Sequence, residues 1–420
     1  MRISTNEFFL GTLNDMLAQE ANVSKLNQQI ASGQSVTDAT DNPTAAAAIL
    51  DTSNQIDQIT TNAANAQAVS STMNETLSVL NQVDSLLNQV QSTALQGATA
   101  TSSSADRQAL ATSVQGSLQE LVQLSNTQLS NGQYIFGGSQ STNAPFQLTP
   151  TGQVIFKGDG GVDQIEIGPS LQVPVAVSGQ SVFMQVPDGN GSFSVSASGT
   201  NTGTGVAALG GVVNSSLVSS EHLADTQFKV SFSAGASGSL NYAIVSGTGA
   251  PGSASFTASS GVVASGAYSS SSAALSFGGM DITFSGTPAA GDNFVVRTSQ
   301  TTNAFQALQN VIAALQAPVD GASGTQARAD QMIQDALATL NQVHTSVLSA
   351  EASLGTSLAE INAVQSQDNT VTTTDQANLA NIQSASMPAV MTQFSEGVTA
   401  LQAAQAAFGK ISGLSLFNYI

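Results

Sequence analysis

Two apolar stripes with a spacing of three and four residues lie near the two ends of the chain. This spacing predicts amphipathic helices, because residues three and four apart share one face of an α-helix. The first stripe consists of Leu10, Leu13, Leu17, Leu26 and Ile30. The second consists of Met387, Val390, Phe394, Gly397, Leu401, Ala404, Phe408 and Ile411. An apolar helix face needs a partner helix, in this chain or another, so the pattern favours an assembling protein over an enzyme.

The first 132 residues are predicted to form helices separated by short breaks. Ser32-Gly33 is a stop signal, and Asp41-Asn42-Pro43 predicts a restart, with Pro43 in the first turn where its missing N–H costs nothing. A second break covers 97–104. Ser103 and Asp106 resemble a capping box and predict the next helix start. Asn131-Gly132 predicts the end of that helix.

The middle of the chain, residues 133–300, changes to short alternating runs rich in Gly, Ser and Thr, which predict strands. The predicted strands cover 153–157, 164–168, 227–233, 240–246, 273–277, 281–285 and 293–298. Gly158-Asp159-Gly160-Gly161 is interpreted as a hairpin turn between the first two strands, and Asp188-Gly189-Asn190-Gly191 as another turn.

Helical spacing returns after residue 300 and continues to the end. One helix is expected up to Pro318, a long helix follows to a polar joint at 365–374, and a last helix begins near Ser386 and Pro388. Matching apolar faces should bring the two ends together, and Gly397 and Ala404 are candidate points of close helix approach. The inner stripes fit an ordinary helical-bundle core equally well, because its apolar spacing is the same as that of a coiled coil.

The expected fold class is α+β. N- and C-terminal segments form a discontinuous helical bundle or coiled coil, which encloses a β-hairpin unit and an inserted β-rich domain. The expected boundaries are a terminal helix at 1–42, the first half of the bundle at 43–132, the hairpin unit at 133–186, a variable outward β domain at 187–300, the second half of the bundle at 301–365 and a terminal helix at 366–420.

The chain is unusually poor in charge, since Asp, Glu, Lys and Arg make up 8% of it, against about 25% in an average soluble domain. The net charge is −19, and no basic residue occurs between Lys25 and Arg107. Nucleic-acid binding needs clustered cations and is therefore excluded, and anionic membrane surfaces are disfavoured. There is no cysteine. The opening residues lack a basic and apolar signal peptide, so export would use another route.

Several motifs resemble bacterial flagellar axial proteins. Residues 26–50, LNQQIASGQSVTDATDNPTAAAAIL, are similar to the flagellin-type helix break, with Asn42 in place of a second Asp. Residues 134–138, YIFGG, and 350–361, AEASLGTSLAEI, are similar to further family patterns, although no Arg precedes Ala350. The opening MRIST and the ending LQAAQAAFGKISGLSLFNYI resemble, more narrowly, the type 3 hook-associated proteins of the hook–filament junction.

This resemblance implies a structural, extracellular protein of the flagellum, with no catalytic residues, no cofactor and no metal. It implies a ring of copies between the first hook-associated protein and flagellin. It also implies unfolded passage through the flagellar type III export apparatus, after a cytoplasmic chaperone has held the C-terminal helix. Both stripes, together with Leu414, Leu416 and Phe417, are then the expected assembly interface. Alternatives are a flagellin filament subunit and a glycan-binding adhesin that uses residues 187–300.

Three other features are weighed as sites. His344 and Glu351 are seven residues apart and are interpreted as a polar pair in a helix seam rather than a metal site. His222 is predicted to be a solvated loop residue. The run from Gly158 to Asp163 lacks the spacing of a calcium loop, so we expect turn chemistry there.

Overall fold

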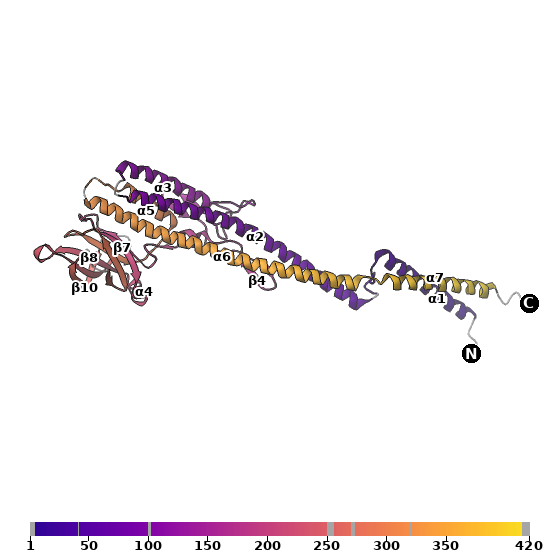
Figure 1. Ribbon diagram of the computed structural model, residues 1–420. Coiled ribbons are helices and arrows are strands. Elements are labelled where there is room, and N and C mark those ends of the chain that lie inside the picture. Colours follow the sequence, from indigo (N-terminus) through magenta and orange to yellow (C-terminus); the bar gives the residue numbers. More distant parts are fainter. Residues whose placement is uncertain are drawn as a thin grey trace, which may run out of the picture. The chain divides into compact units, whose positions relative to one another are not determined.

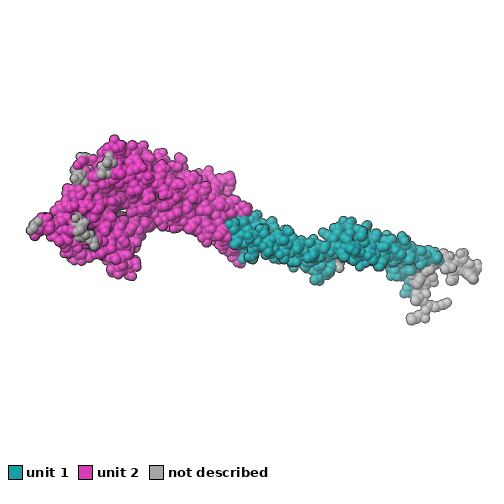
Figure 2. All heavy atoms as spheres, in the orientation of Figure 1, with its two compact units in different colours: residues 1–66, 167–169, 362–420 teal, residues 67–166, 170–361 magenta. Residues whose placement is uncertain are grey.

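The computed structural model describes residues 5–40, 42–99, 102–249, 256–269, 274–319, 321 and 323–413. The chain divides into two compact units, coloured separately in Figure 2. Unit 1 contains Met1–Ala66, Ile167–Pro169 and Asn362–Ile420, and unit 2 contains Gln67–Glu166 and Ser170–Ile361. Residues from both ends of the chain therefore share unit 1. The expected α+β class, with a helical structure made by both ends and a β-rich middle, is confirmed.

Unit 1 is built around the first and last helices. Helix α1, Thr5–Ser32, runs beside α7, Met387–Gly413 (Figure 1). The unit also holds the start of α2, Pro43–Gly97, and the end of α6, Ser323–Gln383. The connecting segments are joined by backbone hydrogen bonds: Ser35 N donates to Gln383 O at 2.6 Å, and Ala385 N donates to Gly33 O at 2.9 Å. The predicted end of the first helix at Ser32 and the predicted start of the next helix at Pro43 are confirmed.

The prediction of a break between helices at the polar segment 365–374 is wrong, because α6 continues through this segment. The threonine hydroxyls there donate to the carbonyl four residues earlier, as in Thr370 to Ser366 O at 3.0 Å and Thr373 to Asn369 O at 2.7 Å. Side chains that are satisfied by their own helix do not interrupt it. A polar run therefore indicated exposure here, and not the end of the helix.

Unit 2 contains the remaining parts of α2 and α6, with α3, Ser104–Ser125, and α5, Ala304–Gln316. The predicted capping box at the start of α3 is confirmed: Ser103 Oγ accepts from Asp106 N, and Ser103 N donates to Asp106 Oδ2. The end expected at Asn131-Gly132 is wrong, because α3 stops at Ser125. There the side chain of Asn126 exchanges two hydrogen bonds with the backbone of Phe146, which favours a turn over another helical residue.

Two short hairpins follow α3. β1, Phe146–Leu148, pairs with β2, Val154–Phe156, and β3, Gln164–Gly168, pairs with β4, Leu171–Pro174. The interpretation of 158–161 as a hairpin turn is therefore wrong, because β2 and β3 do not pair. Asp159 instead ties this segment to an earlier loop by accepting from Ser139 N at 2.8 Å and from Gly161 N at 3.2 Å. The hydrogen bond from the Ser139 hydroxyl lowers the pKa of Asp159 most, and the backbone N–H donors add to this effect.

The β domain consists of two packed sheets. A separate two-stranded sheet pairs β5, Val186–Pro187, with β14, Thr301–Thr302. One sheet has the order β10-β9-β8-β13-β6, and the other β11-β12-β7. Their bounds are β6 Phe193–Ala197, β7 Val206–Val212, β8 Thr226–Ala234, β9 Leu240–Gly249, β10 Phe256–Tyr268, β11 Leu275–Phe277, β12 Met280–Ser285 and β13 Asn293–Thr298. The core between the sheets is apolar and includes Phe193, Phe228, Ile282 and Phe294.

Three short helices complete unit 2: the π-helical turn η1, Gln180–Met184, α4, Ser215–Leu223, and the 3₁₀ turn η2, Ala236–Gly238. His222 lies in the last turn of α4, so its prediction as a loop residue is wrong. Its Nδ1 lies 3.3 Å from Thr298 Oγ1. The turn expected at 188–191 is present, with Gly189 at φ +61° and Gly191 at φ +87°, a backbone region that favours glycine.

Candidate functional site

The seam between α1 and α7 brings together part of the two predicted stripes. Phe9 and Phe408 lie in ring contact with centroids 4.6 Å apart. Leu26 and Val390 are buried, and most other stripe positions on the two helices are partly buried, namely Ile30, Met387, Phe394, Leu401, Ala404 and Phe408. Ile411 lies in α7, while Leu414, Leu416 and Phe417 fall outside the described residues. The seam thus holds the two ends together through apolar packing.

Gly397 marks the close approach of the two helices. A Cβ at this position would lie 3.1 Å from Val23 Cγ2 and 3.4 Å from Gln19 Nε2. The same Gln19 amide donates to Gly397 O at 3.4 Å. The expected close approach at Gly397 is confirmed, since a Cβ here would fit only if the side chain of Val23 shifted.

A second apolar line on α1 is left uncovered. Leu10, Leu13 and Leu17 are exposed to 51%, 37% and 55%. The sequence pattern had placed these leucines on the same helix face as Leu26 and Ile30. Phe9 contacts Phe408 of α7 and Val23 lies beside Gly397, although Phe9 is itself 41% exposed. Three large apolar side chains in a row on an exposed helix are the kind of surface that another protein covers.

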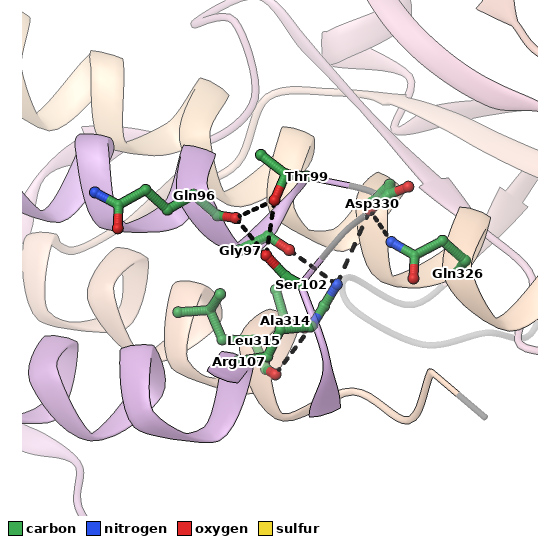
Figure 3. A network of polar contacts seen from close by, with 9 residues as sticks. All are labelled: Gln96, Gly97, Thr99, Ser102, Arg107, Ala314, Leu315, Gln326 and Asp330. Carbon is green, nitrogen blue, oxygen red and sulfur yellow. Dashed lines mark hydrogen bonds and ion pairs between the residues drawn. The ribbon is translucent and has the colours of Figure 1, made fainter. Parts of the chain in front are cut away.

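In unit 2, a buried arginine connects three helices, and sequence reasoning did not single it out as a site. Arg107 of α3 is fully buried. Its Nη1 donates to Gly97 O at 3.1 Å, its Nη2 to Ala314 O at 2.7 Å and its Nε to Leu315 O at 3.4 Å, as Figure 3 shows. These carbonyls end α2 and α5. A cation therefore satisfies the free acceptors and the negative dipole ends of two helices.

The positive charge of Arg107 has a distant and partly exposed acidic partner. Asp330 of α6 lies 4.0 Å from Nη1 with about a quarter of its side chain exposed (26%). Burial lowers the pKa of Arg107, and Asp330 opposes that shift. Burial also raises the pKa of Asp330, against the hydrogen bond from Gln326 and the charge of Arg107. Gly97 leaves no room beside this site, because a Cβ would collide with Leu315.

One sequence signal could have identified Arg107. It occupies the same helix face as the buried residues Ala111, Val114, Leu118 and Leu121 of α3. It is also the only basic residue between Lys25 and Lys157. A single cation on an apolar stripe in a charge-poor chain indicates a specific buried partner.

The histidine in the α2–α6 seam pairs with a different acid from the one expected. His344 Nε2 contacts Asp84, and both side chains are partly buried. Burial raises the pKa of Glu351, with Asp84 adding to the shift and His344 opposing it. In the part of the chain that the structure describes, no three His, Cys, Asp or Glu side chains are grouped to hold a metal ion. Within the same ranges, no helix is long and apolar enough to cross a membrane.

Comparison with known proteins shows what this chain is similar to. Residues 3–141 match the model of the bacterial flagellin N-terminal helical region. Flagellar hook-associated protein 3 of Salmonella typhimurium is 27% identical over 214 residues, which are 50% of this chain and 67% of that protein. The crystal structure of hook-associated protein 3 from Legionella pneumophila superposes with a TM-score of 0.69 at 26% identity, covering 79% of this chain and 98% of that chain. This chain is similar to type 3 flagellar hook-associated proteins in sequence and in fold.

The crystal structure of FlgL from Xanthomonas campestris superposes with a TM-score of 0.64 at 25% identity, covering 78% of this chain and 98% of that one. These similarities support a structural, flagellin-like axial role in the bacterial flagellum. The resemblance found in the sequence is confirmed. Neither a flagellin subunit nor a glycan-binding adhesin is favoured by these relatives.

Proposed function

We propose that copies of this chain form the junction between the hook and the flagellin filament. One Legionella pneumophila relative, 26% identical, is described as a flagellar junction protein, and it supports this place. The proposed neighbours are the first hook-associated protein on one side, flagellin on the other and further copies within the ring. The exposed apolar line of α1 carries the proposal, because a structural subunit needs surfaces that neighbours can cover.

We propose that the assembly interface is the exposed line Leu10, Leu13 and Leu17, together with the remaining stripe residues that the α1–α7 seam exposes. Burying one leucine side chain stabilises an association by about 1.5–3 kcal/mol. The three leucines are already about half covered, so burying their remaining surface would contribute roughly 2–4 kcal/mol in each copy, and further contacts must supply the rest. The segment at Leu414, Leu416 and Phe417 belongs to this proposed interface on the family resemblance alone.

We further propose that the chain leaves the cell unfolded through the flagellar type III export apparatus, and that a cytoplasmic chaperone first holds its C-terminal helix. The chain has no cysteine, so no disulfide would obstruct linear passage. The apolar side of α7 that pairs with α1 in the folded chain is the proposed chaperone-binding surface. One helix face would then serve the chaperone before export and α1 afterwards.

For the domain organisation we propose the six segments given above, with 1–42 and 366–420 lining the inner tube and 187–300 as the outward domain. The β domain supports the last assignment, because it has its own core between two sheets. Its strands lie between two bundle halves that are far apart in the sequence.

Leu13→Asp tests the proposed interface in cells that lack the native copy. Leu13 is exposed in the folded chain, so the variant should fold normally but fail to enter the axial structure. Electron micrographs should show hooks without filaments, with flagellin shed into the medium. Asn14→Asp adds the same charge one residue further along α1 and should leave filaments normal. Normal filaments on Leu13→Asp cells would refute the interface.

The place in the flagellum needs a separate measurement. Immunogold labelling of the native chain should give a single band at the end of the hook. Label along the whole filament would overturn the junction role in favour of a filament subunit.

A further inference from the structure

The β domain is joined to the bundle by two chain crossings, and it contacts α6 at a separate place. The crossings are β5 and β14, which pair antiparallel with Thr302 opposite Val186. Figure 1 shows the β domain beside the N-terminal part of α6. The apolar core between the two sheets is built from residues of the β domain, and no described residue of the bundle helices belongs to it. The β domain and α6 therefore meet without a shared apolar core.

The face of α6 that contacts the β domain is polar. Its residues follow one another at spacings of three and four, which places them on one side of the helix; they are Gly324, Arg328, Gln331, Asp335 and Thr339. The Gln331 side chain is 1% exposed and bonds both backbone groups of Ala207, accepting from its N at 2.6 Å and donating to its O at 2.9 Å. Arg328 donates to Asn201 O, and Thr339 Oγ1 accepts from Gly189 N at 3.1 Å. These hydrogen bonds are the docking contacts.

A cleft of about 810 Å³ separates the β domain from the helices beside the docking contacts. Its floor includes side chains of the five-stranded sheet that point away from the apolar core, such as Ser194, Lys229 and Val295. The opposite side includes Ala313 of α5 and Met332 of α6. Domains of one chain move relative to each other by default unless the interface between them is large and apolar. This interface is polar and incompletely filled.

We propose that the β domain docks reversibly on α6 through Gln331, Arg328 and Thr339, and that it swings away about the β5–β14 pair. Undocking breaks the docking contacts but leaves the apolar core of the β domain and that of the bundle closed. Water bonds the freed backbone groups, so each broken hydrogen bond favours the docked state by only about two- to tenfold. The undocked form is then a minor state of the native chain. The proposal does not depend on the junction role.

Asp335 gives docking a dependence on pH. One of its carboxyl oxygens accepts from Gln331 Nε2 at 2.7 Å. Burial raises the pKa of Asp335 well above its usual range, the Gln331 hydrogen bond opposes the shift, and Asp188 adds to it. The other charged groups around the cleft are Lys229 and Arg297 of the β domain and Arg328 on the same face of α6, while the lining residues of α5 do not titrate. A pKa that docking raises means that docking is strongest at low pH and weakens as the pH rises through the raised pKa.

Amide hydrogen exchange of the native chain, followed by NMR, tests undocking directly. The N–H groups of Ala207 and Gly189 donate to α6 side chains, so undocking should expose both in one event. Their protection factors should be similar and about tenfold or more below those of Val230 and Phe294, which pair inside the five-stranded sheet. Equal protection at all four amides overturns the proposal, because the β domain would then leave α6 only when the whole unit unfolds.

A distance measurement between two spin labels tests Gln331. The chain has no cysteine, so Leu223→Cys in α4 and Leu348→Cys in α6, both at exposed positions, give two unique attachment sites. Gln331→Leu removes both hydrogen bonds to Ala207 and should raise the undocked share about tenfold or more, seen as a second, broader set of distances. Gln334→Leu makes the same change at an exposed position of α6 and should leave the distances native.

Gly324→Val blocks docking at a different contact, because a Cβ there would lie 2.7 Å from Thr202 Cα. It should produce the same broad distances, which keeps the test valid if Gln331→Leu folds poorly. In the labelled chain a rise in pH should increase the undocked share, and Asp335→Asn should remove this dependence. Native distances in both Gln331→Leu and Gly324→Val overturn the proposal, and a pH effect that persists in Asp335→Asn contradicts the role of Asp335.

Discussion

Replacing Arg107 by methionine tests whether its carbonyl contacts hold three helices of unit 2 together. Methionine has similar length and suits an apolar site, but it has no donor. The variant leaves the carbonyls of Gly97 and Ala314 without their closest partner, where the donor distances are 3.1 and 2.7 Å. The contact to Leu315 O at 3.4 Å is long and adds little.

The magnitude follows from these two carbonyls. A buried acceptor left without a donor costs about 1–3 kcal/mol. The carbonyl of Gly97 loses its donor, whereas that of Ala314 keeps a weaker hydrogen bond from Ala317 N at 3.3 Å, so the expected loss is roughly 3 kcal/mol. Removing the buried charge also removes its desolvation cost, which keeps the loss near this value rather than above it. The entropy of unfolding grows with chain length, so unit 2, with roughly 290 residues, loses under about 2 °C in melting temperature for each kcal/mol, and the expected shift is roughly 5 °C.

Thermal unfolding of the full chain, followed by circular dichroism, measures the shift. Asp330→Asn is the matched control, because it removes the opposite charge and keeps all three carbonyl contacts. At 4.0 Å with a partly exposed partner, that ion pair should contribute under about 1 kcal/mol. A melting temperature for Arg107→Met within about 1 °C of the native chain would refute the reasoning. Equal losses in both variants would show that the ion pair, rather than the carbonyls, stabilises the site.

Two further variants follow from other contacts. Gly397→Val should separate α1 from α7, because even a Cβ would lie 3.1 Å from Val23 Cγ2; hydrogen exchange in α1 should rise while α3 stays protected, and unchanged exchange in α1 would contradict this. Glu351→Gln should flatten the pH dependence of stability. The pKa of Glu351 is raised in the folded chain, so the native protein should lose stability as the pH rises above about 4.5 and through that raised pKa. The variant has no carboxyl at this position and should not show this loss. Equal slopes of melting temperature against pH in the two proteins would contradict the assignment, and Glu360→Gln serves as the control.

Local chemistry made several helix limits predictable. Ser32-Gly33, Pro43 and the Ser103–Asp106 box act within one turn of the chain, so the sequence alone determines them. The end of α3 depends instead on hydrogen bonds between Asn126 and Phe146, which are far apart in sequence. Such tertiary contacts override the turn signal at Asn131-Gly132.

Strands were predictable only where alternation was strong. The strands expected at 227–233, 240–246, 281–285 and 293–298 are present as β8, β9, β12 and β13. The unpredicted strands β7 and β10 are rich in Ser, Gly and Ala, whose small side chains give little alternation. The short strand β6 does alternate, as Phe-Ser-Val-Ser-Ala, so the sequence carried a signal for it that was missed.

Periodicity also failed to separate the two apolar lines on α1, and this difference bears on function. A helix with 3.6 residues per turn places Phe9 and Leu13 on adjoining faces, and the sequence does not say which face the chain covers itself. The structure pairs Phe9 with Phe408, yet Phe9 is 41% exposed and Leu13 is 37% exposed. A charge at Phe408 would disturb the α1–α7 pair and assembly together. A charge at Leu13 leaves the Phe9–Phe408 contact in place, so that substitution disturbs the pair less and tests assembly more directly.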